Sequence, residues 1–207
     1  MKTLLYIDVA TFVNDANPQM VKNHIRQEQI KEGLRKLFEY DFSNCDILIT
    51  DNTCTELPKD IDALLPPKTI RRLFEDNRFG SKNKGAGLIQ KWEYNEPLLH
   101  QYDYVLHFEA RLQLTSYSFF DDFFSCPRTL FRWGDLAQTA HTNVFTGLFA
   151  AEVKDILSFC KRFSKEYLIQ NHISIEYPMR EHLKDSLELV AKLGVTWYAF
   201  DGGVHEF

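Results

Sequence analysis

Short runs of apolar residues alternate along the first half of the chain with stretches that have helical spacing. Residues 3–7, 47–49 and 104–106 are predominantly apolar runs of the kind found in strands that are buried on both faces. Between the first two runs, from about Met20 to Phe38, apolar residues recur every three or four positions among charged ones, which predicts an amphipathic helix. The first half therefore mixes buried strands with helices that bury one face.

Residues 69–74 predict a further strand, and residues 88–94 begin a second helix that Pro97 should end or kink. The resulting order is strand, helix, strand, strand, helix, strand, which predicts an α/β protein with a mainly parallel central sheet flanked by helices. The second half is less regular. Residues 116–124 predict an aromatic flap or a pocket wall, and residues 128–133 predict a strand that is antiparallel or at an edge. Helices are predicted at 152–163 and from about residue 179 or 180, followed by a last strand at 195–200 and a loop-like tail.

Composition limits the classes of function. The chain has 207 residues, which favours one domain, and its formal net charge of -5 argues against non-specific nucleic-acid binding. Its four cysteines contain no C-x-x-C pair, so reduced thiols in a cytoplasmic protein are the favoured interpretation. Asp8 interrupts the N-terminal apolar run, which is too short for a signal peptide, and no stretch is apolar enough to span a bilayer.

Polar residues follow three of the predicted strands. They are Asp8 after the first strand, Asp51 and Asn52 after the second, and His107, Glu109 and Arg111 at the end of the strand that begins at Tyr104. The last three occupy alternating positions, so in an extended chain their side chains point to the same side. The carboxyl ends of parallel strands meet at one sheet edge, where ligands usually bind. A surface charge cluster where a strand leaves the core is the alternative.

A loop rich in lysine and glycine precedes the second predicted helix, on the same edge of the sheet. Its residues Lys82, Asn83, Lys84 and Gly85 combine positive charge with a glycine that lets backbone N–H groups approach an anion closely. The spacing fits neither a Walker A loop nor a G-x-G-x-x-G motif. An ordinary solvated loop is the alternative interpretation.

The order of these motifs resembles that of GT-A-type nucleotide-sugar glycosyltransferases, and most of all the short bacterial enzymes that build capsule or lipopolysaccharide. The matching pieces are Asp-Asn-Thr at 51–53, Asn-Lys-Gly at 83–85, a strand leading into Ala110-Arg111, an acceptor-side segment at 143–149, and Ser-Ile-Glu at 174–176. The resemblance covers about residues 3–183. It implies a GT-A-like, Rossmann-like fold over residues 1–207, with a donor half at about 1–114 and an acceptor half at about 115–207.

The resemblance also implies partners and roles. The donor would be a UDP- or GDP-sugar and the acceptor a glycan or a lipid-linked glycan, with peripheral contact at the inner membrane left open. Glu176 would be the catalytic base and Arg111 would stabilise the leaving diphosphate. The donor would be bound by Asp8, Asp51, Asn52, Lys82, Asn83, Lys84, Gly85 and Glu109. Glu176 could equally be a glutamate that starts a helix, and Asp8 could cap a turn.

One position departs from the family pattern, because His107-Phe108-Glu109 stands where many of these enzymes carry Asp-x-Asp. In one interpretation, His107 and Glu109 bind Mn or Mg together with His205. In the other, which is favoured, the enzyme is metal-independent and Lys82, Lys84 and Arg111 neutralise the diphosphate.

Two other classes of function stay open. A non-catalytic protein of this fold, acting as a binding or scaffold subunit, is compatible with the missing Asp-x-Asp. A sugar nucleotidyltransferase would normally have a glycine-rich loop after the first strand, and residues 7–14 contain no glycine.

Overall fold

The computed structural model describes residues 1–14, 21–134, 143–198 and 204–207. In this part of the chain the main sheet has eight strands, in the order β3-β4-β2-β1-β5-β8-β7-β9. The strands are β1 Thr3–Val9, β2 Asp46–Asp51, β3 Thr53–Cys54, β4 Ile70–Glu75, β5 Tyr104–Glu109, β7 Leu130–Phe131, β8 Leu148–Glu152 and β9 Glu188–Leu189.

The centre of this sheet is parallel, as the sequence predicts. Strands β4, β2, β1 and β5 run in the same direction, whereas β8 pairs antiparallel with β5 and β7 pairs antiparallel with β8. The chain moves from β1 outward to β2 and β4, then returns to the other side of β1 as β5. The sheet therefore changes its direction of growth between β1 and β5, and in open α/β sheets this switch point is where ligands bind.

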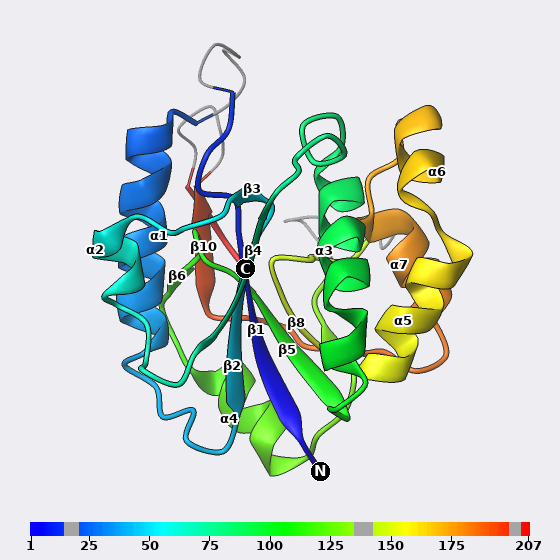
Figure 1. Ribbon diagram of the computed structural model, residues 1–207. Helices are drawn as coiled ribbons and strands as arrows, with labels where there is room; N and C mark the ends of the chain where they lie inside the picture. The colour runs from blue at the N-terminus through cyan, green and yellow to red at the C-terminus, as the bar shows by residue number, and fades with distance from the viewer. Residues whose placement is uncertain (15–20, 135–142, 199–203) are drawn as a thin grey trace.

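Helices cover both faces of the sheet, with α1 and α2 on one side and α3, α5, α6 and α7 on the other (Figure 1). Strand β1 shows why both faces must be covered, because Leu5 and Ile7 pack toward α1 while Leu4 and Tyr6 pack toward α3. The helices are α1 Asn23–Leu37, α2 Lys59–Asp62, α3 Lys84–Leu99, α4 Ser118–Ser125, α5 Val153–Arg162, α6 Lys165–Gln170 and α7 Glu176–Leu183.

A second, smaller sheet packs beside α1. Its strands are β6 Gln113–Leu114, β10 Val195–Tyr198 and β11 Val204–Glu206, in the order β11-β10-β6. The expectation of a loop-like tail is therefore wrong for residues 204–206, which pair antiparallel with β10. Because β6 directly follows the end of β5, this sheet joins the end of the chain to the switch point.

Three helices differ from their predicted form. Helix α3 begins at Lys84 because Asn83 caps it, its side chain accepting a hydrogen bond from the Ala86 N–H at 3.0 Å, and it continues past Pro97 to Leu99. Helix α7 begins at Glu176, before Pro178, which suits a first turn. The expected aromatic flap is instead helix α4, whose Phe119, Phe120 and Phe123 are buried in the core.

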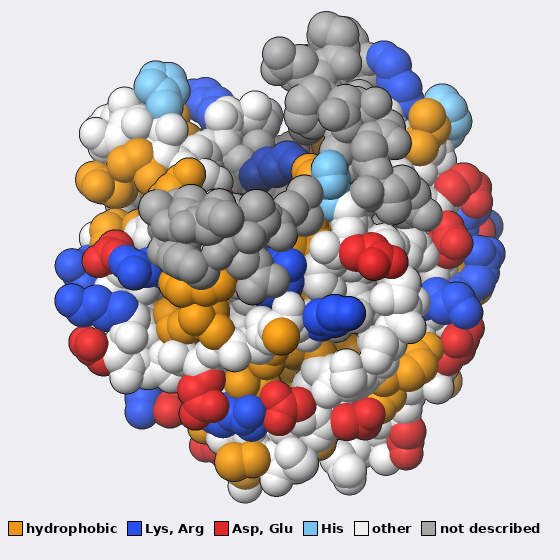
Figure 2. Space-filling model, turned by 180° about the vertical axis from the view of Figure 1, so that it is seen from behind, with side chains coloured by type: hydrophobic (Ala, Val, Ile, Leu, Met, Phe, Trp, Pro, Cys, Tyr) orange, Lys and Arg blue, Asp and Glu red, His pale blue; other side chains and the backbone are white. Residues whose placement is uncertain are grey.

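The surface shows no unusual charge pattern on the face seen in Figure 2, where described lysine, arginine, aspartate and glutamate side chains are interspersed. Among the helices that the structure describes, none combines the length and the apolar character needed to cross a membrane.

Gly33 sets how closely α1 approaches the turn after β5. A Cβ atom at this position would meet the backbone oxygen of Ala110 and lie 2.7 Å from that of Leu112. Alanine normally stabilises a helix interior relative to glycine, but here the neighbours are backbone atoms that cannot rotate away. We expect Gly33→Ala to destabilise the protein by about 1–3 kcal/mol in urea unfolding, the usual cost of overpacking. Glu32→Ala, on the exposed side of α1, is the matched control, and equal stability of the two variants would contradict the prediction.

Candidate functional site

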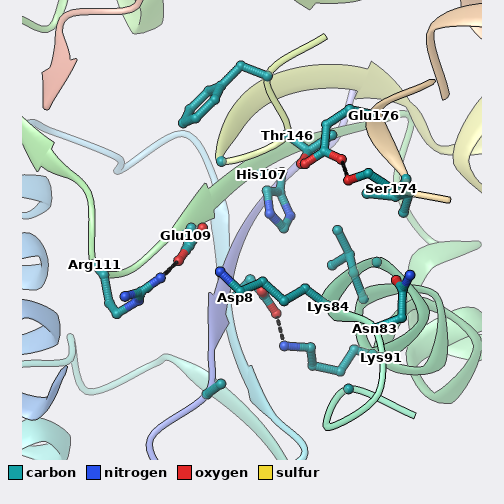
Figure 3. A pocket seen from close by; sticks show the side chains of 18 of the residues that line it. Asp8, Asn83, Lys84, Lys91, His107, Glu109, Arg111, Thr146, Ser174 and Glu176 are labelled. Atoms are coloured by element: carbon teal, nitrogen blue, oxygen red, sulfur yellow. Dashed lines mark hydrogen bonds and ion pairs between the residues drawn. The ribbon is translucent and has the colours of Figure 1, made fainter. Parts of the chain in front are cut away.

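A cavity of about 680 Å³ opens at the carboxyl ends of β1 and β5, beside the switch point of the sheet. Its volume is in the range of small-molecule binding sites. Its walls come from β1, α1, α3, β5, the segment before β8, and the start of α7. His107, Glu109 and Arg111 all line it, His107 and Glu109 from β5 and Arg111 from the turn that follows β5. Figure 3 labels ten of the residues that line the cavity, among them Asp8, Glu109 and Glu176.

Asp8 ends inside this cavity and forms an ion pair with Lys91 of α3 (Figure 3). Lys91 also donates a hydrogen bond to the Val9 carbonyl at 3.1 Å, and its side chain is only 5% exposed. Burial raises the pKa of Asp8 to about 6, although the ammonium of Lys91 opposes the shift. The carboxyl end of β1 is thus held to α3 by a buried charge pair.

Glu109 lies next to Asp8 on the neighbouring strand and is held by Arg111. The Nε and Nη2 atoms of Arg111 donate to the same oxygen, Glu109 Oε1, at 3.1 and 2.6 Å. Burial by itself would raise the pKa of Glu109, but the cations of Arg111, Lys84 and Arg26 outweigh it and lower the pKa to about 2. Glu109 is therefore a carboxylate at neutral pH, surrounded by positive charge.

Arg26 is a site residue that the sequence interpretation misses. It lies on α1, is 5% exposed, lines the cavity, and donates from Nη1 to the Ala10 carbonyl at 3.3 Å. Its Nε has no hydrogen-bond partner among the described residues. Burial lowers its pKa to about 10, which leaves the guanidinium charged at neutral pH. The available signal was a cation on the apolar stripe that also carries Ile30 and Leu34.

His107 lies deep in the cavity wall between aromatic rings. Its ring stacks on Phe149 with centroids 4.7 Å apart and on Tyr6 with centroids 5.7 Å apart, and the side chain is 1% exposed. Burial lowers its pKa to about 3, with the nearby Lys91 acting in the same direction, so the imidazole is neutral at ordinary pH.

Glu176 lies on the other side of the cavity from Arg111 (Figure 3). It is the first residue of α7, so it is a helix-start glutamate and a cavity residue at the same time. Thr146 Oγ1 donates to Glu176 Oε1 at 3.1 Å, and the Ser174 hydroxyl donates to Oε2. These two hydroxyls fix the orientation of the carboxylate, and the sequence carries no distinctive signal for either of them.

The Asn-Lys-Gly segment joins the two sides of the cavity. Besides capping α3, Asn83 donates from Nδ2 to the Ile173 carbonyl at 3.0 Å. Gly85 packs against the residue before Glu176, since a Cβ there would lie 2.5 Å from Ile175 Cβ. Lys84 lines the cavity, and its pKa is lowered by partial desolvation there, with Glu109 opposing the shift.

Three of the predicted site residues lie elsewhere. Asp51 is fully buried and accepts hydrogen bonds from the backbone N–H groups of Thr11 and Thr53 at 2.8 and 2.7 Å, so it braces the loop after β1. Lys82 is exposed and outside the cavity lining, because the turn before Asn83 directs it to solvent. His205 is also outside the lining, where its ring stacks on Trp197 at 5.8 Å.

Asn52, by contrast, lines the cavity and donates to Gln90 Oε1 at 3.2 Å. Of the predicted donor residues, the cavity therefore brings together Asp8, Asn52, Asn83, Lys84, Gly85 and Glu109.

The donor set does not fit a divalent metal ion. In the part of the chain that the structure describes, no group of three or more His, Cys, Asp or Glu side chains is placed to hold one. The two carboxylates at the strand ends, Asp8 and Glu109, are each already paired with a cation. The neutral imidazole of His107 would then be the one remaining ligand at these strand ends, and one ligand is too few to hold a divalent metal ion.

Comparison with known proteins supports the fold. No family model and no curated protein matches the sequence. Among solved structures, core-mannan synthase A from Aspergillus fumigatus, in its Mn/GDP form, aligns with a TM-score of 0.55 and 10% identity over 95% of this chain and 74% of that chain. The 1-349 fragment of S. aureus TarS gives 0.57 and 11% over 94% of this chain and 59% of that one.

A third structure, assigned as a glucose-1-phosphate thymidylyltransferase from Bacillus anthracis, gives a TM-score of 0.54 and 12% identity over 92% of this chain and 87% of that chain. At these identities the likeness establishes the fold. The protein has the GT-A, Rossmann-like fold of nucleotide-diphospho-sugar glycosyltransferases, with a mostly parallel central sheet flanked by helices.

Proposed function

We propose that the protein is a glycosyltransferase that moves a sugar from a nucleoside-diphosphate sugar to a glycan or lipid-linked acceptor. One observation carries this proposal: a single cavity at the switch point has buried cations on one wall and a hydroxyl-held carboxylate on the other. Breaking a sugar–diphosphate bond needs positive charge at the leaving group and a base at the acceptor hydroxyl. The cavity supplies both on the fold that solved nucleotide-sugar transferases share.

On the donor side, Arg111 and Lys84 are the groups that would contact the diphosphate, next to the capped N-terminus of α3. Asp8 and Asn52 lie at the carboxyl ends of β1 and β2, where they would contact the nucleoside. On the acceptor side, Glu176 would accept the hydroxyl proton while Thr146 and Ser174 hold its carboxylate in place.

The narrower parts of the proposal are supported by the sequence resemblance alone. They are a UDP- or GDP-sugar donor, a role in bacterial capsule or lipopolysaccharide synthesis, and a location in the cytoplasm or at the periphery of the inner membrane. The division of the chain into a donor half and an acceptor half is likewise supported by the sequence resemblance alone.

A thermal-shift screen of UDP-, GDP-, CMP- and dTDP-sugars, each with Mn²⁺ and with EDTA, tests the proposal. At a ligand concentration about 100 times Kd, binding adds about 2.7 kcal/mol to stability, so a true donor should raise the unfolding temperature clearly. If none of the sugar nucleotides shifts unfolding in either condition, the proposal is wrong.

The likeness to a thymidylyltransferase fold makes nucleotidyl transfer the second candidate. The products distinguish the two reactions, because a nucleotidyltransferase releases pyrophosphate from a nucleoside triphosphate and a sugar phosphate, whereas a glycosyltransferase releases a nucleoside diphosphate. A non-catalytic binding protein would bind the donor and release neither product.

A further inference from the structure

The carboxyl ends of β1 and β5 carry more positive than negative charge. Asp8 and Lys91 form one pair of opposite charges. Around Glu109 stand three cationic side chains, Arg26, Lys84 and Arg111, which we call the cation cluster. With Glu109 ionised, the cluster and its carboxylate carry a net formal charge of about two positive units, which would repel a divalent cation placed among them.

The two arginines of the cation cluster are held in place before any ligand arrives. Arg111 is 6% exposed and fixed by its two hydrogen bonds to Glu109 Oε1. Arg26 is 5% exposed, anchored to the Ala10 carbonyl, and keeps Nε without a partner among the described residues. Lys84 reaches the cavity from the first turn of α3. The two arginines, held in this way, need little rearrangement to receive an anion, whereas Lys84 is exposed and has no fixed partner among the described residues.

We propose that the cation cluster does the work of a divalent metal ion, so that the protein binds nucleoside diphosphates and releases them from the donor without a metal. This inference rests on the proposed function. It also replaces Lys82, which lies outside the cavity, with Arg26 as the third cation.

The charge balance of the reaction supports this assignment. When the bond between the anomeric carbon and the diphosphate oxygen breaks, its electron pair stays on that oxygen. The leaving nucleoside diphosphate gains one negative charge, and the acceptor hydroxyl forms the new bond to the anomeric carbon while its proton moves to Glu176. Guanidinium groups can donate two parallel hydrogen bonds to a phosphate, and they remain charged throughout.

Isothermal titration of UDP, GDP and dTDP, and of the three corresponding monophosphates, in EDTA and again in MnCl₂, tests the inference. For at least one nucleoside diphosphate, we expect Kd in the two buffers to agree within about threefold, or ~0.6 kcal/mol. Lys84→Gln should weaken diphosphate binding in EDTA at least about tenfold, or ~1.4 kcal/mol, and monophosphate binding by much less. Lys82→Gln, two residues away on the same turn but outside the cavity, is the matched control and should keep the wild-type Kd.

Arg26→Gln gives a second, independent variant, with its urea unfolding curve recorded to show that it folds. It should lose diphosphate affinity in the same direction as Lys84→Gln. The inference is overturned if EDTA weakens binding more than about tenfold, or if Lys84→Gln behaves like Lys82→Gln. Binding only in Mn²⁺ would overturn the inference and leave the proposed function standing. An absence of diphosphate binding in both buffers would overturn the proposed function itself.

Discussion

Replacing Glu176 with glutamine is expected to lower the rate of sugar transfer by about 10²- to 10⁴-fold, the usual contribution of a general base. The amide keeps the shape of the side chain and can still pair with Thr146 and Ser174, but it cannot accept the acceptor's proton. Donor binding should change little, because Glu176 lies across the cavity from Arg111. Turnover and the Kd of the nucleotide, measured on the same preparation, check both expectations.

Glu181→Gln is the control for this experiment. It lies on the same helix, is exposed, and is outside the cavity lining, so it should keep full activity. Unchanged turnover in Glu176→Gln would remove Glu176 as the base, and the helix-start role would be the one that remains.

Glu109→Gln is expected to cost about 3 kcal/mol of unfolding free energy at pH 7. The substitution leaves the buried cations of Arg111 and Arg26 without their carboxylate. The pKa of Glu109 is about 2 in the folded protein and 4.5 in the unfolded chain, so its stabilisation is fully present above pH 4.5 and is lost as the pH falls through 2. The difference between wild type and variant should therefore shrink below about 2 kcal/mol at pH 3.

Urea unfolding of both proteins between pH 7 and pH 3 measures this difference directly. Glu75→Gln, an exposed carboxylate at the end of β4, provides the comparison and should remain within about 0.5 kcal/mol of wild type. A Glu109→Gln deficit that stays constant from pH 7 to pH 3 would contradict the assigned pKa and its cause.

The parallel half of the fold could be predicted because its signal is strong. Strands β1, β2 and β5 contain apolar runs that only a sheet covered on both faces can bury, and each run ends at a polar residue near the switch point. The structure of the aromatic segment that forms α4 was harder to predict, because clustered phenylalanines suit a pocket wall as well as a core. Only packing against the sheet decides between the two.

Site residues could be predicted where polar side chains stand at the end of a strand. They could not be predicted where membership of the site depends on the direction in which a side chain points. Asp8 and Asp51 both lie at the carboxyl end of a buried strand, yet one enters the cavity and the other braces the Thr11 loop. Arg26 and Lys91 stand on apolar helix faces, where a long side chain could equally reach outward to water. A single sequence does not show which carboxylate lies near the charged end of each of these side chains.

The close approach of Gly85 to Ile175 bears on how this protein can be engineered. Gly85 packs against Ile175, the residue before Glu176, and Asn83 ties the start of α3 to the same segment by its hydrogen bond to the Ile173 carbonyl. A chimera that exchanges residues 115–207 for those of another protein of this fold must therefore supply a backbone carbonyl for Asn83 and a side chain that leaves room at Gly85. Residues 83–85 and residues 173–175 therefore need to be exchanged together.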